Sequence, residues 1–171
     1  MIKIKLITVK NFNDHSLDEY ERRQDVKRVY RKAGEEYVLT EMPYTEDWDA
    51  DKKRSVARDM LSAEYIAYAA FDNETVAGFI GLKKQLWGGY MILDMMHVSA
   101  QYRGKGIGRS LFEYGIAEAK RAGAKALYIS ACSSEETIAF YRAMGAELTN
   151  EPIREIAEEE PFDLQLVCSV L

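Results

Sequence analysis

The residues with the clearest chemical potential lie in one short stretch, Gln101-Tyr-Arg-Gly-Lys-Gly-Ile-Gly-Arg109. Three glycines at alternate positions leave consecutive backbone N–H groups uncovered, and three cationic side chains stand beside them. An apolar run precedes the stretch and an apolar periodic segment follows it, which indicates a strand that turns into a helix. A helix N-terminus with unpaired N–H groups binds anions, and glycine lets a bulky phosphate approach the backbone. The stretch therefore predicts a diphosphate site.

Three kinds of phosphate loop can be separated by pattern. A P-loop has Ser or Thr after its Gly-Lys pair, but Gly106 follows Lys105 here, and a dinucleotide fingerprint needs a wider spacing than that between Gly106 and Gly108. What remains is Arg103-x-x-Gly106-x-Gly108 after a strand ending at Val98, and it resembles the coenzyme A loop of the GNAT superfamily of acyl-CoA N-acyltransferases. The alternative is a glycine-rich turn with solvated charges. It does not explain why three glycines and three cationic residues occur together between a strand and a helix.

The resemblance implies acetyl-CoA as co-substrate. Its pyrophosphate would lie on the loop, and the preceding strand would align its pantetheine arm by backbone hydrogen bonds. An amide of that strand would also stabilise the oxyanion, a contribution on the order of 10²- to 10³-fold. The implied cofactor-binding residues are Met96, His97, Val98, Arg103, Gly104, Lys105, Gly106, Ile107, Gly108 and Arg109, with Ser134 at a position where many members carry Asn. Serine keeps one hydrogen bond there but has a shorter reach.

Tyr141 is the candidate general acid. It lies in Ile138-Ala-Phe-Tyr-Arg-Ala-Met-Gly145, which resembles the family's helix motif, where a tyrosine four residues before a glycine sits near the coenzyme sulfur. A phenol can donate a proton to the departing thiolate. The alternative is an aromatic anchor whose hydroxyl is hydrogen-bonded at the surface. The spacing from Gly145 and an upstream capping box, Ser133 with Glu136, favour the acid.

Asp94 is the candidate base. It is the one carboxylate in the apolar strand before the loop, where burial without a partner is costly. Family members often carry an acid four residues before the equivalent of Val98, where it binds or deprotonates the acceptor amine. The alternative is a structural ion pair. Alternation along a strand puts Asp94 on the same side as Met96 and Val98, and His97 on the other.

The acceptor is expected to meet the acidic, aromatic segment of residues 44–49. Tyr44, Asp47 and Trp48, with Asp49 and Glu41 nearby, would suit a cationic amine, although a solvated acidic loop explains the composition equally well. Residues 78–94 are similar to streptothricin acetyltransferases, which modify a cationic antibiotic. Both features favour a small cationic acceptor.

Bulk composition limits the other functions. A formal net charge of −5 disfavours binding to nucleic acid, and no apolar segment is long enough to span a membrane. Residues 1–6 alternate rather than form a signal peptide, and Cys132 and Cys168 have neither metal-ligand spacing nor a disulfide framework around them. We therefore expect a cytoplasmic protein with reduced cysteines and no metal. A single domain over residues 1–171 is expected from the length and the lack of a linker.

Hydropathy patterns predict the elements that position these residues. Strands are expected at residues 2–9, 65–71, 76–86, 90–98, 126–131, 146–148 and 162–171, and helices at 17–30, before Leu61, 107–123 and 133–145. Residues 36–39 fit a short strand or a helix end, and Pro43 is expected to break whatever precedes it. A helix between the strands ending at Val98 and beginning at Ala126 predicts one parallel β-α-β crossover in a mostly antiparallel sheet, the α/β architecture that the resemblance implies.

The expected activity is N-acetyl transfer from acetyl-CoA to a primary amine by direct attack in a ternary complex. No Ser-His-Asp arrangement is evident and Cys132 lacks a histidine partner, so covalent catalysis is disfavoured. Two alternatives stay open: a protein N-terminus or lysine as acceptor, and a non-catalytic acyl-CoA-binding module. Many relatives dimerise through their C-terminal strands, so residues 162–171 are a candidate homodimer surface.

Overall fold

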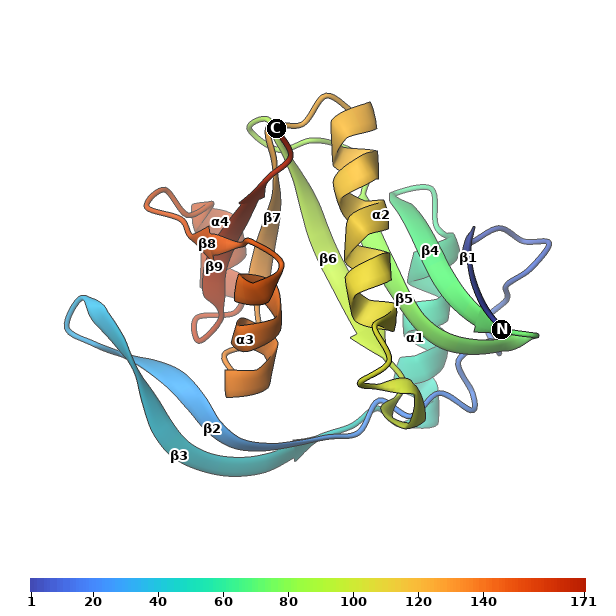
Figure 1. Ribbon diagram of the computed structural model, residues 1–171, viewed down its shortest axis with the longest axis horizontal. Helices are drawn as coiled ribbons and strands as arrows, with labels where there is room; N and C mark the ends of the chain where they lie inside the picture. The colour runs from blue at the N-terminus through green and yellow to red at the C-terminus, as the bar shows by residue number, and fades with distance from the viewer.

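The computed structural model describes residues 1–171 as a seven-stranded sheet, a separate two-stranded ribbon and four α-helices (Figure 1). The strand order is β1-β4-β5-β6-β7-β9-β8, and every neighbouring pair is antiparallel except β6 with β7. The predicted mixed α/β fold with one parallel crossover is therefore confirmed. The elements are β1 (Ile2–Leu6), β2 (Gln24–Ala33), β3 (Glu36–Glu46), α1 (Ala50–Leu61), β4 (Tyr65–Asp72), β5 (Thr75–Lys83), β6 (Tyr90–Val98), α2 (Ile107–Arg121), β7 (Ala126–Ala131), α3 (Glu135–Ala143), β8 (Glu147–Leu148), α4 (Arg154–Glu159) and β9 (Leu164–Ser169).

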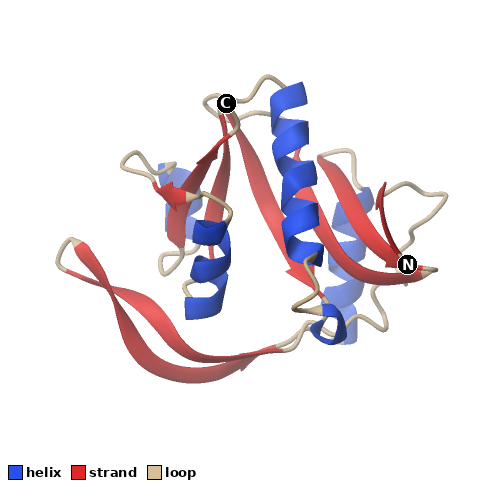
Figure 2. Ribbon diagram, viewed as in Figure 1, coloured by secondary structure: helices blue, strands red, loops and turns tan.

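The sheet is the middle layer of three. Helices α2 and α3 cover one face, and α1 and α4 cover the other (Figure 2). The predicted α2 stripe of Leu111, Gly115 and Ala119 is buried against the sheet. A Cβ at Gly115 would lie 2.9 Å from Ile80 Cδ1, so glycine lets α2 approach the sheet closely. This packing fixes where α2 begins, and hence where the glycine-rich loop lies.

The parallel pair β6 and β7 separates partway along its length. Pairing runs only from Tyr90 with Ala126 to Leu93 with Ile129, and the two strands then diverge (Figure 1). Beyond Leu93, β6 is paired with β5 alone. From Asp94 to Val98 the edge of β6 that faces β7 has no strand partner and can bond a ligand chain, except at the Val98 carbonyl, which accepts from Arg103.

A β-bulge falls at Asp94. The register of β6 on β5 steps from Leu93 opposite Leu82 to Met95 opposite Gly81, which leaves Asp94 without a partner residue. A bulge turns one residue out of the regular alternation. The prediction that Asp94 shares a side with Met96 and Val98 is wrong for this reason, since Leu93, Met96 and Val98 all pack on the core beneath α2 while Asp94 is exposed.

The helix predicted over residues 17–30 is wrong. Residues 24–33 form strand β2, which pairs with β3 as a long ribbon, and residues 15–19 form turns. Val26 and Val29 are both buried although they are three residues apart, which imitates the period of a helix. The ribbon crosses the open ends of β6 and β7 and reaches α3 (Figure 1).

Pro43 does not end its segment. Strand β3 runs through it because β3 pairs only with β2, and proline is tolerated where one edge of a strand is free. Helix α4 was not predicted, and the cap of α3 is Ser134 rather than Ser133. The predicted strands at 65–71, 76–86, 90–98 and 126–131 and the end of α2 before Gly123 are confirmed, with small differences at the boundaries. None of the helices combines the length and the apolar character that crossing a membrane requires.

Candidate active site

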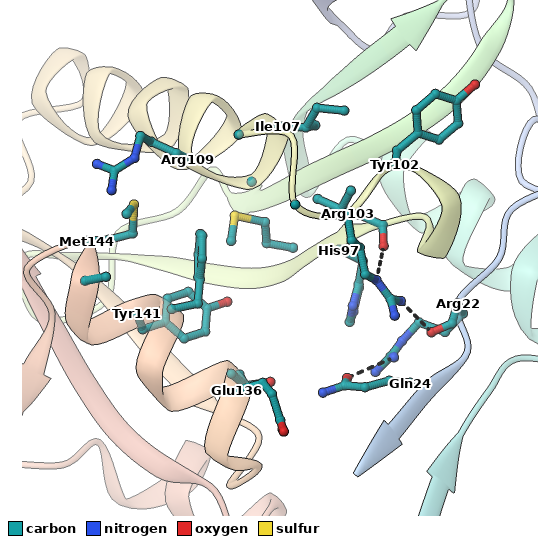
Figure 3. Close-up of a pocket in the computed structure, with 18 of the residues that line it drawn as sticks. Arg22, Gln24, His97, Tyr102, Arg103, Ile107, Arg109, Glu136, Tyr141 and Met144 are labelled. Atoms are coloured by element: carbon teal, nitrogen blue, oxygen red, sulfur yellow. Dashed lines mark hydrogen bonds between the residues drawn. The ribbon is translucent and has the colours of Figure 1, made fainter.

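A hollow of about 620 Å³ lies where the N-terminus of α2, the end of β6 and one face of α3 meet. We call it the first hollow. Figure 3 shows Arg109 at the start of α2, His97 on β6 and Tyr141 on α3 around it. Of the residues predicted to bind the cofactor, nine line it: Met96, His97, Val98, Arg103, Gly104, Gly106, Ile107, Gly108 and Arg109. The structure thus brings the loop and the strand end together as predicted.

The loop presents a row of unpaired amides. Helix α2 has Gly106 as its N-cap with no side-chain cap, and the backbone N–H groups of residues 104–109 have no acceptor within the protein. Gly104 and Gly106 have φ of +77° and +82°, which disfavour other residues, and the space beside both is open. Gly108 differs, since a Cβ there would lie 3.2 Å from the Phe140 ring. The loop can therefore surround an anion closely.

Arg103 has a different place from the one expected. Its Nε donates to the carbonyl of Val98 at 2.9 Å, and its two terminal nitrogens donate to the carbonyls of Arg23 at 2.7 Å and Arg22 at 3.0 Å. The guanidinium therefore ties the segment before β2 to the end of β6. Arg109 has no such bonds and is exposed at the hollow. Lys105 does not line the hollow, and its ammonium lies 5.5 Å from the centre of the Tyr102 ring.

Tyr141 is buried on α3, and its hydroxyl has no hydrogen-bond partner in the protein although the residue lines the first hollow. Burial raises the pKa of the phenol above its usual value, and the nearby Cys132 and Asp163 raise it further. The group therefore keeps its proton at neutral pH. A protonated, unpaired hydroxyl at the wall of this hollow is suited to donate a proton to a leaving group.

A second hollow of about 890 Å³ lies on the α4 side of the sheet, at the point where β6 and β7 separate. Its lining includes the carboxylates of Glu64, Asp94, Glu155 and Glu159 and the amines of Lys83 and Lys84. Asp94 accepts a hydrogen bond from Tyr65 at 2.6 Å, and burial, with Asp94 nearby, raises the pKa of Tyr65 to about 12. Asp94 therefore lies in this acidic hollow and not beside Tyr141 in the first.

The other predicted site residues are dispersed. Asp47 and Trp48 line a third hollow beside Tyr20 and Lys53, and the Trp48 ring packs against His97, with 5.0 Å between ring centres. Tyr44 lies on β3 with its hydroxyl 3.8 Å from the Cys132 sulfur. Ser134 is fully buried and its hydroxyl caps α3, so it does not line the first hollow. The expected acceptor wall of residues 44–49 does not form one surface.

Three site features escaped the sequence interpretation. Arg22 and Gln24 line the first hollow from the start of the β2–β3 ribbon, and Gln24 donates to Ser134 at 3.3 Å, which links the ribbon to α3. Asp163 lies near Tyr141, just before β9. Neither the segment with Arg22 and Gln24 nor the one with Asp163 carries a local motif. The apolar residues of β2 were the only feature of the sequence that indicated the ribbon, and they fit a helix equally well.

The geometry of the site suits a coenzyme A thioester. Free amides around open space suit a diphosphate, and a free strand edge suits an extended amide-bearing arm. A loop of this kind at the mouth of a splayed parallel pair defines an acyl-CoA-dependent acyltransferase.

The family model described as "Acetyltransferase (GNAT) family" matches residues 24–146, and the chain belongs to this family. The protein is thus an acetyltransferase, and acetyl-CoA is its co-substrate. No curated protein matches the sequence significantly.

Solved structures share the fold. A nourseothricin acetyltransferase is 18% identical with a TM-score of 0.74, and 99% of each chain is covered. A putative streptothricin acetyltransferase from Bacillus anthracis str. Ames, solved with acetyl coenzyme A, is 17% identical with a TM-score of 0.74, covering 99% of this chain and 98% of that one. The ribosomal-protein-S18-alanine N-acetyltransferase from Escherichia coli is 15% identical with a TM-score of 0.60, covering 99% and 94%. The fold is therefore common to acetyltransferases with different acceptors.

Proposed function

We propose that the protein transfers the acetyl group of acetyl-CoA to a primary amine of a small cationic molecule. The observation that carries this proposal is the position of the two hollows at the gap between β6 and β7. The first offers amides and a phenol, and the second, which begins at Asp94, is rich in carboxylates. A thioester held in the first hollow and an amine held in the second would meet in the gap.

The donor side of the proposal assigns a role to each group. The amides of residues 104–109, with Lys105 and Arg109 nearby, hold the pyrophosphate, and the free edge of Met96 to Val98 aligns the pantetheine arm. Tyr141 donates a proton to the thiolate. Arg103 orients the loop from behind and holds the ribbon in place.

The acceptor side selects charge and size. The second hollow holds four carboxylates against two lysines, which favours a cation, and its volume of about 890 Å³ falls in the range of about 300–1,000 Å³ typical of small-molecule sites. Asp94 binds the incoming ammonium in this proposal, and Tyr65 fixes the carboxylate. Tyr44 has no part in it, because it lines neither of these hollows. Asp47 and Trp48 have no part in it, because they line another hollow.

The test measures free thiol released from acetyl-CoA in the presence of streptothricin-type and aminoglycoside antibiotics, polyamines, and peptides with a free N-terminus or lysine. We expect turnover with a polycationic small molecule and little with peptides. Tyr141→Phe should lower kcat by about 10²-fold or more with acetyl-CoA affinity nearly unchanged, because the acid acts only in the transition state. Turnover with peptides alone would support the protein-acceptor alternative. Binding without turnover would support a non-catalytic module.

A further inference from the structure

Asp163 is linked to residues of both hollows. It comes directly before β9, and its Oδ2 accepts a hydrogen bond of 3.0 Å from Ser130 Oγ at the end of β7. Ser130 lines the second hollow. The charge of Asp163 is also close enough to Tyr141, in the first hollow, to raise the pKa of the phenol. Asp163 is therefore bonded to one residue of the second hollow and lies near one residue of the first.

A chain of hydrogen bonds ends on this carboxylate. The backbone N–H of Ile153 donates to the Tyr128 hydroxyl at 3.0 Å, and this hydroxyl donates to Gln165 Oε1 at 2.6 Å. Gln165 Nε2 then donates to Ser130 Oγ at 2.9 Å, and Ser130 donates to Asp163. With the Gln165 amide in this orientation, each group of the chain donates toward Asp163.

This direction gives the two oxygens of Asp163 different roles. Oδ2 accepts the hydrogen bond of Ser130, while Oδ1 accepts no hydrogen bond from the protein. Tyr128 is fully buried and Gln165 nearly so, which holds the chain in place. The carboxylate is therefore oriented by the protein and keeps one oxygen available.

From this geometry we infer that Asp163 is the group that removes the proton from the acceptor amine, an assignment that rests on the proposed function. An ammonium R–NH₃⁺ gives one proton to Oδ1 of Asp163, and the freed nitrogen lone pair forms the C–N bond with the thioester carbon. The C–S bond breaks with its electron pair on sulfur, to which Tyr141 donates its proton. The second nitrogen proton returns to the Tyr141 phenolate, and the proton on Asp163 leaves to solvent.

The surroundings of Asp163 favour the protonated form of its carboxyl, which suits a group that accepts a proton. Burial raises the pKa of its carboxyl, the Ser130 hydrogen bond opposes this, and Glu160 in the same loop raises it further. Tyr141 faces it from α3. Glu155 and Glu159 of α4 line the second hollow with Ser130, and Arg31 of β2 stacks on the adjacent Phe162 ring at 4.3 Å. The Asp94 carboxylate also lines the second hollow, where it accepts a hydrogen bond from Tyr65.

Asp163→Asn tests the inference, because an amide still accepts the Ser130 hydrogen bond but cannot take a proton. For the best amine of the thiol-release panel, we expect kcat/KM near pH 7 to fall about 10²-fold. The deficit should shrink as the pH approaches about 10, where an ordinary amine loses its proton unaided. The affinity for acetyl-CoA, measured by calorimetry, should not change. Glu160→Gln is the matched control. Activity should persist, and the decrease of kcat/KM at acid pH should move to lower pH, because Glu160 raises the pKa of Asp163.

Several results would overturn the assignment. The assignment is wrong if kcat/KM of Asp163→Asn depends on pH as in the wild type, or if kcat/KM falls by the same factor at every pH. It is also wrong if Asp94→Asn, and not Asp163→Asn, loses the decrease of kcat/KM at acid pH. If Asp163→Asn does not fold by circular dichroism, Asp163→Glu replaces it and must retain the acid limb. A wild-type protein that releases no thiol with any amine would refute the proposed function, whereas an active wild type with an unaffected Asp163→Asn refutes only the role of Asp163.

Discussion

Tyr141 and His97 both line the first hollow, and desolvation keeps each in one protonation state. Burial raises the pKa of the phenol, so Tyr141 enters the reaction as an acid. Burial, with Arg22 and Arg103 nearby, lowers the pKa of His97 to about 3, so the imidazole is neutral throughout the physiological range. His97 therefore contributes packing against Trp48 and the backbone of β6 rather than proton transfer.

His97 gives a prediction at the residue scale. Between about pH 6.5 and 3 the unfolded chain protonates this histidine and the native protein does not, so the unfolding free energy falls as the pH falls through this window. His97→Phe should make that acid-side decline shallower, by up to about 1.4 kcal/mol per pH unit. Denaturant unfolding at pH 7, 6 and 5 measures it. An imidazole NMR signal of His97 that titrates near pH 6.5 would contradict the argument.

At the scale of elements, the β2–β3 ribbon is fastened at two places. Arg103 holds the carbonyls of Arg22 and Arg23 at one end. Midway along β2, the Tyr30 amide donates to the Ser133 carbonyl at 2.8 Å, and Arg28 pairs with Glu135 at 2.7 Å. An isolated two-stranded ribbon is marginally stable, so these attachments keep it across the open ends of β6 and β7.

Arg103→Ala should therefore destabilise the protein. Three carbonyls lose their donor, which we expect to cost about 1–3 kcal/mol and lower Tm by several degrees, with faster hydrogen exchange at residues 22–26. Arg109→Ala is the control, since this cation borders the same hollow without protein hydrogen bonds and should weaken coenzyme A binding with Tm unchanged. Equal Tm for both variants would place Arg103 among the ligand contacts instead.

The elements also show what sequence could predict. The loop, Tyr141 and the strands from Tyr65 to Ala131 follow from local spacing, and the structure places them as expected. Two features made the sequence misleading. The buried Val26 and Val29, three residues apart on β2, imitated a helix, and the bulge at Asp94 moved that carboxylate out of its expected alternation. Asp163 was beyond prediction because its orientation depends on Tyr128, Gln165 and Ser130, which only the pairing of β7 with β9 brings together.

On the scale of the whole molecule, we propose that the donor and the acceptor bind on opposite sides of one sheet. The first hollow lies on the side of α2 and α3, and the second on the side of α4. The parallel pair ends at Leu93 and Ile129, so β6 and β7 are no longer paired where the strands approach the two hollows. In the proposed function each substrate occupies its own hollow.

Filling one hollow at a time should separate the two substrates. Ala143→Trp, on the α3 wall of the first hollow, should weaken acetyl-CoA binding about 10-fold or more. Ile156→Trp, on the α4 wall of the second, should raise KM for the amine by a similar factor and leave the Kd of acetyl-CoA unchanged. Calorimetry and steady-state kinetics on both variants supply the comparison. If Ile156→Trp raised the Kd of acetyl-CoA, the two substrates would not occupy separate hollows.

We propose that the amides of residues 104–109 hold the diphosphate of acetyl-CoA and place its thioester beside Tyr141. Amide hydrogen exchange with and without coenzyme A tests this arrangement, since these N–H groups have no acceptor in the free protein. We expect strong protection confined to this loop and to residues 95–98. Unchanged exchange in the loop, or protection centred on the second hollow, would contradict it.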